Sequence, residues 1–565
     1  MINNETENIV KDELKKELTD DELEILISGW IKETSSYFEI LKDIIKKNIE
    51  YYKGNQTDVS NIRGNNSKAV ENRIFMGIET IVPIITSQPP DMVCEAPDDS
   101  EKGNISASRL QRALMYHYER VGIKKVSERW IRDLIIKRFA VLKPFWNAQT
   151  DDVDVKVIDP RRIKFPKYGS SVDELPYTIE DLEMSYPSVR DFFGEEVAKD
   201  LLKRIPTTDR DEMKKRKVTF TIQEVWTNDM VIWRTPGKIL KKEKNIYYDF
   251  VDSNKNFFTY ARKPFIIDSI FQTDETIIGD TDLVVQTIPI QDNINKRKRQ
   301  IEDIAAKVAN PPLLIDSDVM DEETASTITN EAGIIVYGKD VAQPGKVRFE
   351  TPGQLPSYLF EDLLSSRNEF DNIFGTHSTT RGVAGGKTLG QDILAKQSDM
   401  GRIDLVKRRF DYAIGELAGW WTQLMKMNYD EARFIRISGE LGVIEKFTIS
   451  DIENGVKVLV KSGTAIPQDE VSIRQEATNL FQLGVLDPLT LYEKLKFPDV
   501  AGTFKRLADF RTGKLFGEVS GTGAMPAESG VASSENLGQL AGAGGSSQSI
   551  GQNLAQGRSE IQQSQ

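Results

Sequence analysis

The 565-residue sequence is poor in the side chains that most often build metal and redox sites. It contains one cysteine, Cys94, and two histidines, His117 and His377. A single cysteine excludes a disulfide within the chain, and these three residues cannot supply a zinc site at any usual spacing. We therefore expect no metal ion and no cofactor.

The chain also lacks a long apolar run. Its most apolar segment, residues 74–87, is interrupted by Glu79 and Pro83 and is too short to span a bilayer. The first 22 residues are acidic and contain no apolar core of a signal peptide. We expect a soluble protein without a membrane anchor.

An excess of positive charge is absent as well. Asp and Glu number 87 against 74 Lys and Arg, which gives a formal net charge of −13. Proteins that hold nucleic acid along an extended surface are usually basic, so this balance argues against such a surface. The basic cluster at residues 296–299 fits a solvated helix face or a contact with nucleic acid or an acidic partner about equally well.

No common catalytic signature is complete, because the chain has neither G-x-S-x-G nor H-E-x-x-H. A glycine-rich segment ends in Gly386-Lys387-Thr388 like a phosphate-binding loop, but Arg381 replaces the first glycine of that motif. The segment also follows an amphipathic helix, not the buried strand that would aim backbone N–H groups at phosphates. We expect a helix-to-helix loop and no catalytic residue. A P-loop-like NTPase using Gly386, Lys387 and Thr388 stays the alternative.

The sequence does contain a series of amphipathic helices at its N-terminal end. Thr19 and Glu22 form the pattern of a capping box, which starts a helix that ends near Gly54. Three more helices are predicted over residues 68–87, 106–120 and 124–139.

The apolar period then changes to two, in residues 152–166 and 217–272, which predicts an antiparallel β region. Helical periodicity returns over residues 289–309 and 356–374, with a mixed, partly strand-like segment between them. A third helix over residues 389–424 would be about 54 Å long. Strands and short helices follow, so the fold class is α+β. The remaining predictions are strands in residues 433–463, helices over 469–483, 488–495 and 500–512, and a low-complexity segment rich in Gly, Ser, Ala and Gln from about 517.

Four stretches, taken in order, resemble the portal proteins of tailed phages, the head-to-tail connector family. The likeness covers about residues 30–510, and the joint order of the stretches carries it. They are YYKGNQ with the following residues 63–97, VIDPRRIKFP at 157–166, the helix and proline turn at 287–315, and the helical stretch at 464–500.

The resemblance implies a portal fold with an α/β wing, a two-helix stem, a small mixed clip, a long helix after a tunnel loop, and a helical crown. The implied boundaries are 1–287 for the N-terminal part of the wing (helices, then antiparallel strands), 288–310 and 356–374 for the stem helices, 311–355 for the clip, 375–388 for the tunnel loop, 389–467 for the long helix and further wing strands, 468–516 for the crown, and 517–565 for a flexible tail without a helical barrel.

The resemblance also implies a function. A dodecamer would form a ring-shaped channel at one capsid vertex of the virion, assembled in the host cytoplasm. Double-stranded DNA would be packaged through it by the terminase large subunit, retained and later ejected. Further partners would be the major capsid and scaffolding proteins and a head-to-tail adaptor. A scaffold or adaptor without a through-channel is a weaker alternative.

Two sets of site residues follow from this resemblance. In the clip, Lys339, Lys346 and Arg348 are candidates for docking the terminase and the adaptor. An acidic protein suits a channel through which DNA slides. Each contact between a cation and a phosphate adds salt-dependent affinity for DNA, and a ring would repeat that contact in every subunit. The residues expected to face the DNA channel from the tunnel loop are Thr376, His377, Arg381, Gly382, Gly385, Gly386 and Lys387.

Overall fold

The computed structural model divides the chain into two compact units, Met1–Asp487 and Pro488–Gln565, and each is described by itself. The residues that the structure describes are 18–56, 67–87, 90–96, 98, 100–204, 219–247, 257–309, 311, 313–327, 335–341, 346–349, 356–376, 389–429, 433–436, 444–448, 452, 456–461, 470–495, 502, 503 and 506.

Helix α2 (Asp20–Lys53) begins and ends as predicted. The Thr19 backbone N–H donates to Glu22 Oε2 at 2.8 Å, and the Glu22 N–H donates back to Thr19 Oγ1 at 3.4 Å, which completes the capping box. The helix ends at Gly54, whose φ of +89° is in the left-handed region that glycine adopts without strain.

The next three helices form where they were predicted, but their ends differ. Helix α3 (Arg73–Thr86) begins later than predicted, because Asn72 caps it by accepting from the Phe75 N–H at 3.0 Å. Helix α4 (Glu101–Val121) begins earlier, because Ser100 caps it. Helix α5 (Ile123–Ile136) stops before residue 139, since Arg138 has a φ of +71° and the chain then enters a strand.

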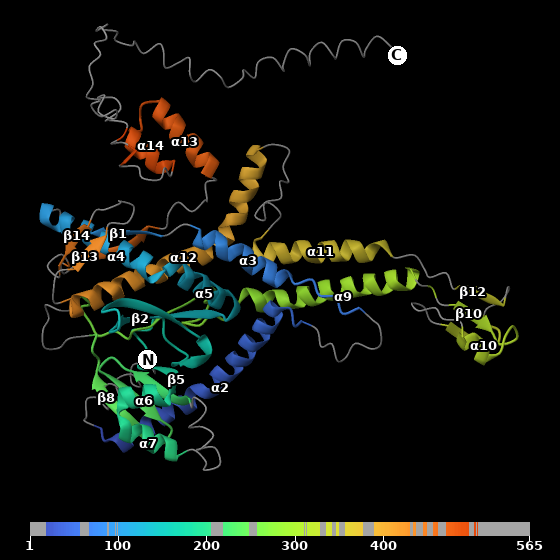
Figure 1. Ribbon diagram of the computed structural model, residues 1–565, viewed down its shortest axis with the longest axis horizontal. Coiled ribbons are helices and arrows are strands. Elements are labelled where there is room, and N and C mark those ends of the chain that lie inside the picture. The colour runs from blue at the N-terminus through green and yellow to red at the C-terminus, as the bar shows by residue number, and fades with distance from the viewer. Residues whose placement is uncertain are drawn as a thin grey trace, which may run out of the picture. The chain divides into compact units, whose positions relative to one another are not determined.

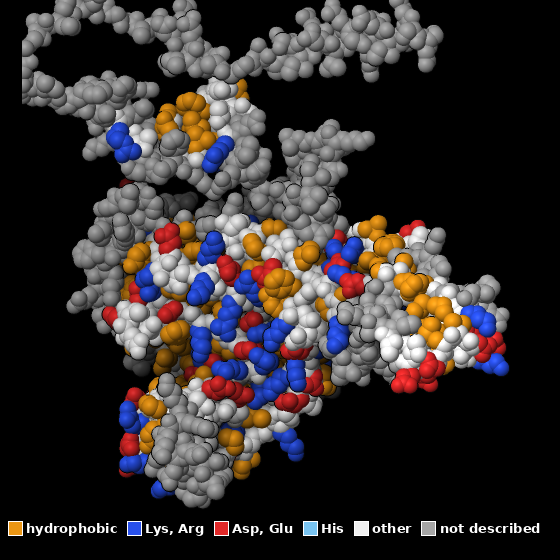
Figure 2. All heavy atoms as spheres, turned by 45° about the vertical axis from the view of Figure 1, so that its right-hand side comes forward, with side chains coloured by type: hydrophobic (Ala, Val, Ile, Leu, Met, Phe, Trp, Pro, Cys, Tyr) orange, Lys and Arg blue, Asp and Glu red, His pale blue; other side chains and the backbone are white. Residues whose placement is uncertain are grey.

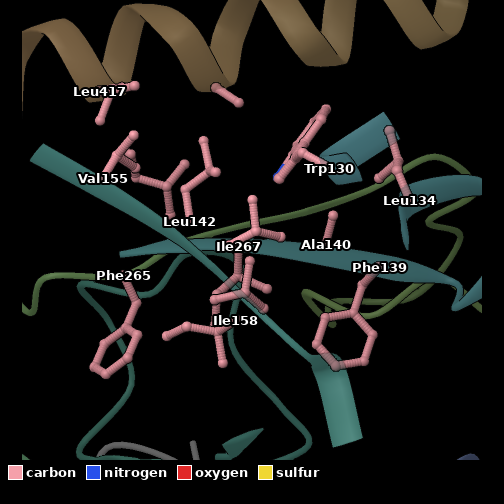
Figure 3. Packing of buried hydrophobic residues seen from close by; sticks show 14 of the residues in the cluster. Trp130, Leu134, Phe139, Ala140, Leu142, Val155, Ile158, Phe265, Ile267 and Leu417 are labelled. Carbon is pink, nitrogen blue, oxygen red and sulfur yellow. The ribbon is translucent and has the colours of Figure 1, made fainter. Parts of the chain in front are cut away.

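The core of the first unit is built on a three-stranded antiparallel sheet of order β3-β2-β9. Figure 3 shows Trp130 of α5 and Leu417 of the long helix α12 (Leu389–Asn428) packed on one side of this sheet, with Phe139 and Phe265 on the other. The sheet is therefore buried on both faces. Its strands are β2 (Phe139–Asn147), β3 (Asp152–Ile158) and β9 (Ile266–Ser269).

A second, five-stranded sheet is antiparallel throughout and follows the chain order β4-β5-β6-β7-β8. It confirms the predicted antiparallel β region, although β9 joins the other sheet. Strand β5 and two short helices after it were not predicted. These elements are η2 (Pro160–Arg162), β4 (Ile163–Lys164), β5 (Thr178–Ser185), α6 (Tyr186–Phe193), α7 (Glu195–Lys203), β6 (Thr219–Trp226), β7 (Met230–Thr235) and β8 (Lys238–Lys244).

Helices α9 (Leu283–Ala309) and α11 (Ser357–Phe374) lie side by side (Figure 1). Helix α9 begins earlier than the predicted residue 289, because Asp282 accepts from the Val285 N–H at 2.8 Å and Pro289 is accommodated inside the helix. Helix α12 (Leu389–Asn428) has 40 residues and confirms the predicted long helix.

The chain between α9 and α11 contains a three-stranded sheet of order β11-β10-β12, in which β10 pairs parallel with β11 and antiparallel with β12. Elsewhere β1 pairs with β15 and β13 with β14. The elements are β1 (Asp91–Glu95), β10 (Leu313–Asp316), α10 (Glu322–Thr327), β11 (Ile335–Gly338), β12 (Val347–Phe349), β13 (Arg433–Arg436), β14 (Ile444–Phe447), β15 (Lys457–Lys461) and α13 (Glu470–Gln482), with α14 (Pro488–Lys494) in the second unit.

Candidate functional site

The α9–α11 pair packs through the apolar stripe that the sequence predicted on α11. All four stripe residues are buried, and the rings of Phe370 and Phe374 stack with centroids 5.0 Å apart. Phe374 also lies against Gly77 of α3, where an added Cβ would come within 2.7 Å of the ring. The end of α11 is therefore held tightly against α3. The stripe consists of Leu359, Leu363, Phe370 and Phe374.

Two arginine–carboxylate pairs reinforce this junction. Arg73 Nη2 donates to both oxygens of Asp371, at 2.7 and 2.9 Å, and both side chains are buried. Arg367 forms a bidentate pair with Glu71, at 2.6 and 2.9 Å. Burial works to raise the pKa of Glu71, but hydrogen bonds and charge from Arg367, together with Arg73, hold that pKa below its usual value.

Helix α9 binds the segment that leads into α3. The Gln291 side chain donates to the Glu71 carbonyl at 2.7 Å and accepts from the Arg73 N–H at 3.0 Å. Asn295 accepts from the Glu71 N–H at 2.9 Å. These contacts satisfy backbone groups that no regular element pairs, so the helix pair is fastened to α3 by buried polar contacts.

The predicted tunnel loop starts from this fastened end. Gly375 has a φ of +72° and donates to the Asp371 carbonyl at 2.8 Å, and Thr376 is buried. The chain resumes as α12 at Leu389. The segment therefore connects two helices, as expected for a helix-to-helix loop, and does not follow a strand. The predicted channel residues His377, Arg381, Gly382, Gly385, Gly386 and Lys387 lie outside the described residues.

The three clip candidates belong to the small sheet. Lys339 directly follows β11 and is exposed. Lys346 is exposed, lies 3.7 Å from the carboxylate of Asp318, and its carbonyl accepts from the Asp316 N–H at 2.9 Å. Arg348 lies on β12 opposite Leu314. Gly338 pairs with Asp316 on the other side, so Lys339 and Lys346 reach the same end of the sheet.

An apolar surface on the helix pair was missed by the sequence analysis. Figure 2 shows apolar side chains gathered along this pair. Among the exposed apolar residues, Phe360 and Leu364 are four residues apart on α11 and outside the buried stripe. Apolar residues on more than one face of the predicted helix were the available signal. The exposed residues are Val308 at 46%, Tyr358 at 60%, Phe360 at 52% and Leu364 at 57%.

Within the described part of the chain, no cluster of three or more His, Cys, Asp or Glu side chains is placed to hold a metal ion. None of the helices in the described ranges has both the length and the apolar composition needed to cross a membrane. His117 is buried, and its pKa falls to about 4 because burial disfavours the charged ring.

Comparison with known protein families gives one match, over the middle part of the chain. Residues 214–478 match the family model of the phage P22-like portal proteins. The resemblance to portal proteins is confirmed over these residues. The matched stretch contains α9, the small sheet, α11 and α12. Portal proteins are structural proteins of the virion.

Two solved structures resemble the chain more distantly. "Neck of empty GTA particle computed with C6 symmetry" has a TM-score of 0.35 and 11% identity, and covers 75% of this chain and 89% of that chain. "Virion of native gene transfer agent (GTA) particle" has a TM-score of 0.35 and 12% identity, and covers 79% of this chain and 99% of that chain. No curated protein matches the chain.

Proposed function

We propose that this chain is a portal protein, twelve copies of which form a ring-shaped channel at one capsid vertex. The family match over residues 214–478 carries the proposal. The terminase large subunit would package double-stranded DNA through the ring, which would later retain and eject that DNA. The capsid and scaffolding proteins would surround the ring, and a head-to-tail adaptor would bind it. No catalytic residue is needed for these roles.

The proposal assigns parts of a portal to the elements described above. Helices α9 and α11 form the stem, and the small sheet between them in the chain forms the clip. The supporting observation is that the two helices pack along their length while the intervening chain forms its own sheet. The α2–β9 region and the strands after α12 form the wing, and α13 belongs to the crown.

The exposed surface of the helix pair supports a ring. A closed ring needs a heterologous contact, in which two different surfaces of each copy meet. One exposed surface of α11 carries Phe360 and Leu364 beside the exposed carboxylates Glu361 and Glu369. Helix α9 exposes Lys296. Burying an apolar side chain of this size against a second copy contributes about 1.5–3 kcal/mol, and opposite charges favour this orientation.

The site residues keep their predicted roles within this proposal. The segment at residues 375–388 faces the channel with His377, Arg381, Gly382, Gly385, Gly386 and Lys387, whereas Thr376 is buried at its start and does not. The cations Lys339, Lys346 and Arg348 dock the terminase and then the adaptor. The exposure of Lys339 and Lys346 at one end of the small sheet supports this second role.

Electron microscopy of the purified chain tests the proposal. We expect class averages of rings with a central hole, and no ATP hydrolysis by the same preparation. A monomer that hydrolyses ATP would overturn the proposal, and loss of that activity in Lys387→Ala would favour the P-loop-like NTPase. A compact assembly without a central hole would favour a scaffold or adaptor.

A further inference from the structure

A groove lined by cations lies between α5, β3, η2 and β5. Its volume is about 580 Å³. Arg129 comes from α5, Lys156 from β3, and Arg161 and Arg162 from η2. We call these four residues the basic groove. Lys156, Arg161 and Arg162 lie close together in the sequence, and Arg129 of α5 joins them only in the fold.

The carboxylates of the groove are already paired, two of them with the groove cations Arg161 and Arg162. Asp159 accepts from Arg161 at 2.8 Å and from Lys137 at 3.1 Å. Burial works to raise the pKa of Asp159, but hydrogen bonds from Arg161 and the charge of Lys137 hold it well below its usual range. The remaining two carboxylates are paired as well: Glu183 lies 3.0 Å from Arg162, and Glu180 lies 2.6 Å from Lys143.

Two of the cations keep their charge available to a ligand. Arg129 and Lys156 are exposed, and neither forms an ion pair with any residue that the structure describes. Lys156 lies directly opposite Lys143 in the β2–β3 register, but Lys143 pairs with Glu180 and Glu224, so its own charge is already balanced. Lys125, one turn before Arg129 on α5, is also exposed.

The lining favours nucleic acid over an acidic protein surface. Apart from Val157 and Ile158, which are buried strand residues, all lining side chains are charged. Protein partners usually anchor through buried apolar or aromatic residues, and the groove offers none that is exposed. Phosphate contacts need no such anchor, and the guanidinium fork matches two phosphate oxygens.

We propose that the basic groove binds the phosphate backbone of DNA, independently of the base sequence, as a contact separate from the tunnel loop. The inference rests on the proposed function only because DNA passes through a portal ring. The groove has room for a phosphate and its sugar. Contacts to phosphate and sugar do not distinguish one base from another, so this contact carries no sequence information.

Binding of a fluorescent duplex of about 30 base pairs, measured by anisotropy at several salt concentrations, tests the inference. In Arg129→Gln/Lys156→Gln we expect weaker binding, and the slope of log affinity against log salt should fall by about 0.9 for each lost contact. The control Lys32→Gln/Lys199→Gln removes two exposed cations outside the groove and should leave the slope unchanged. The charge-preserving Arg129→Lys/Lys156→Arg should bind nearly as the parent chain does.

A second measurement uses the unaltered chain, so it does not depend on a variant that folds. DNA should protect Lys156 from an amine-reactive reagent, while Lys199 reacts as before. An unchanged salt slope in the double variant, together with an unprotected Lys156, would overturn the inference. Binding of poly-glutamate in place of DNA would do the same. Either of these results leaves the proposed function intact as long as rings still form. If no rings form, the proposed function is contradicted but the DNA contact at the basic groove is not.

Discussion

At the scale of single residues, Asp268 shows how burial in the core sets a pH dependence. It lies in β9, where one oxygen accepts from the Ser269 N–H at 2.8 Å and lies 3.4 Å from Arg409 of α12. The other oxygen is buried without a hydrogen-bond partner within the described part of the chain. Burial raises the pKa of Asp268 to about 6, although Arg409 works against this rise.

Asp268→Asn should therefore stabilise the fold at neutral pH. Between about pH 4 and pH 6 the folded state holds a proton that the unfolded chain has lost, so the parent chain loses stability as the pH rises through this window. We expect the variant to be more stable by about 1–2 kcal/mol at pH 7 and similar to the parent below pH 4, since one pKa unit corresponds to about 1.4 kcal/mol and Arg409 loses a partner.

Thermal unfolding between pH 4 and pH 8 measures this difference. Asp191→Asn is a suitable control, because Asp191 is exposed and pairs only with its neighbour Arg190 among the described residues. A gap between Asp268→Asn and the parent that does not widen from pH 4 to pH 6 would contradict the assigned cause.

At the scale of elements, the helices and strands that were predicted correctly are those whose sequence signals are local. The capping box and Gly54 fix both ends of α2 without help from distant residues, so this helix was predicted well. Strand β2 was missed because it is buried on both faces, which removes the period-two alternation, and because it follows α5 almost directly.

The candidate site was predictable only in part. The stripe on α11 and the segment at residues 375–388 could be found from periodicity and glycine content. The bond between Arg73 and Asp371 could not, because it joins residues 298 positions apart and depends on how α3 packs. The basic groove likewise exists only once α5, β3 and η2 are folded together.

The exposed surface of α11 gives a prediction at this scale. Phe360→Asp/Leu364→Asp should prevent ring formation or raise the protein concentration needed for it by at least about tenfold, since losing the burial of even one such side chain costs about 1.5–3 kcal/mol. The fold of the single chain should persist, because both side chains are exposed in it.

Mass photometry over a range of protein concentrations measures this effect. Asn368→Asp adds a negative charge to the same exposed side of α11 without removing apolar surface, and it should still form rings. Rings of the double variant at the parent concentration would exclude this surface from the contact between copies.

At the scale of the whole molecule, the net charge of −13 and the charges of the basic groove act over different distances. An average over the chain indicates solubility and long-range repulsion, whereas a groove of four cations acts within about one Debye length. An acidic protein can therefore hold phosphate at one place while repelling it elsewhere.

Shortening the proposed tunnel loop should separate the effect on folding from the effect on passage of DNA. Deleting residues 382–386 should leave ring formation intact, because the chain on both sides is anchored in α11 and α12. We expect phage particles assembled with this variant to contain less DNA than the parent particles, or to lose it during storage. The measurement is the DNA content of purified heads. Heads that fill normally and keep their DNA would show that the loop has no role in the channel.

The pairing of β1 with β15 has a consequence for synthesis. These strands are residues 91–95 and 457–461, so the sheet that contains Cys94 needs nearly the whole first unit before it can form. Contacts between residues so far apart in the sequence form late in folding, because the entropy of closing the long loop is lost before the contacts add any stability. A chain whose synthesis has not passed residue 461 therefore lacks the partner strand of β1.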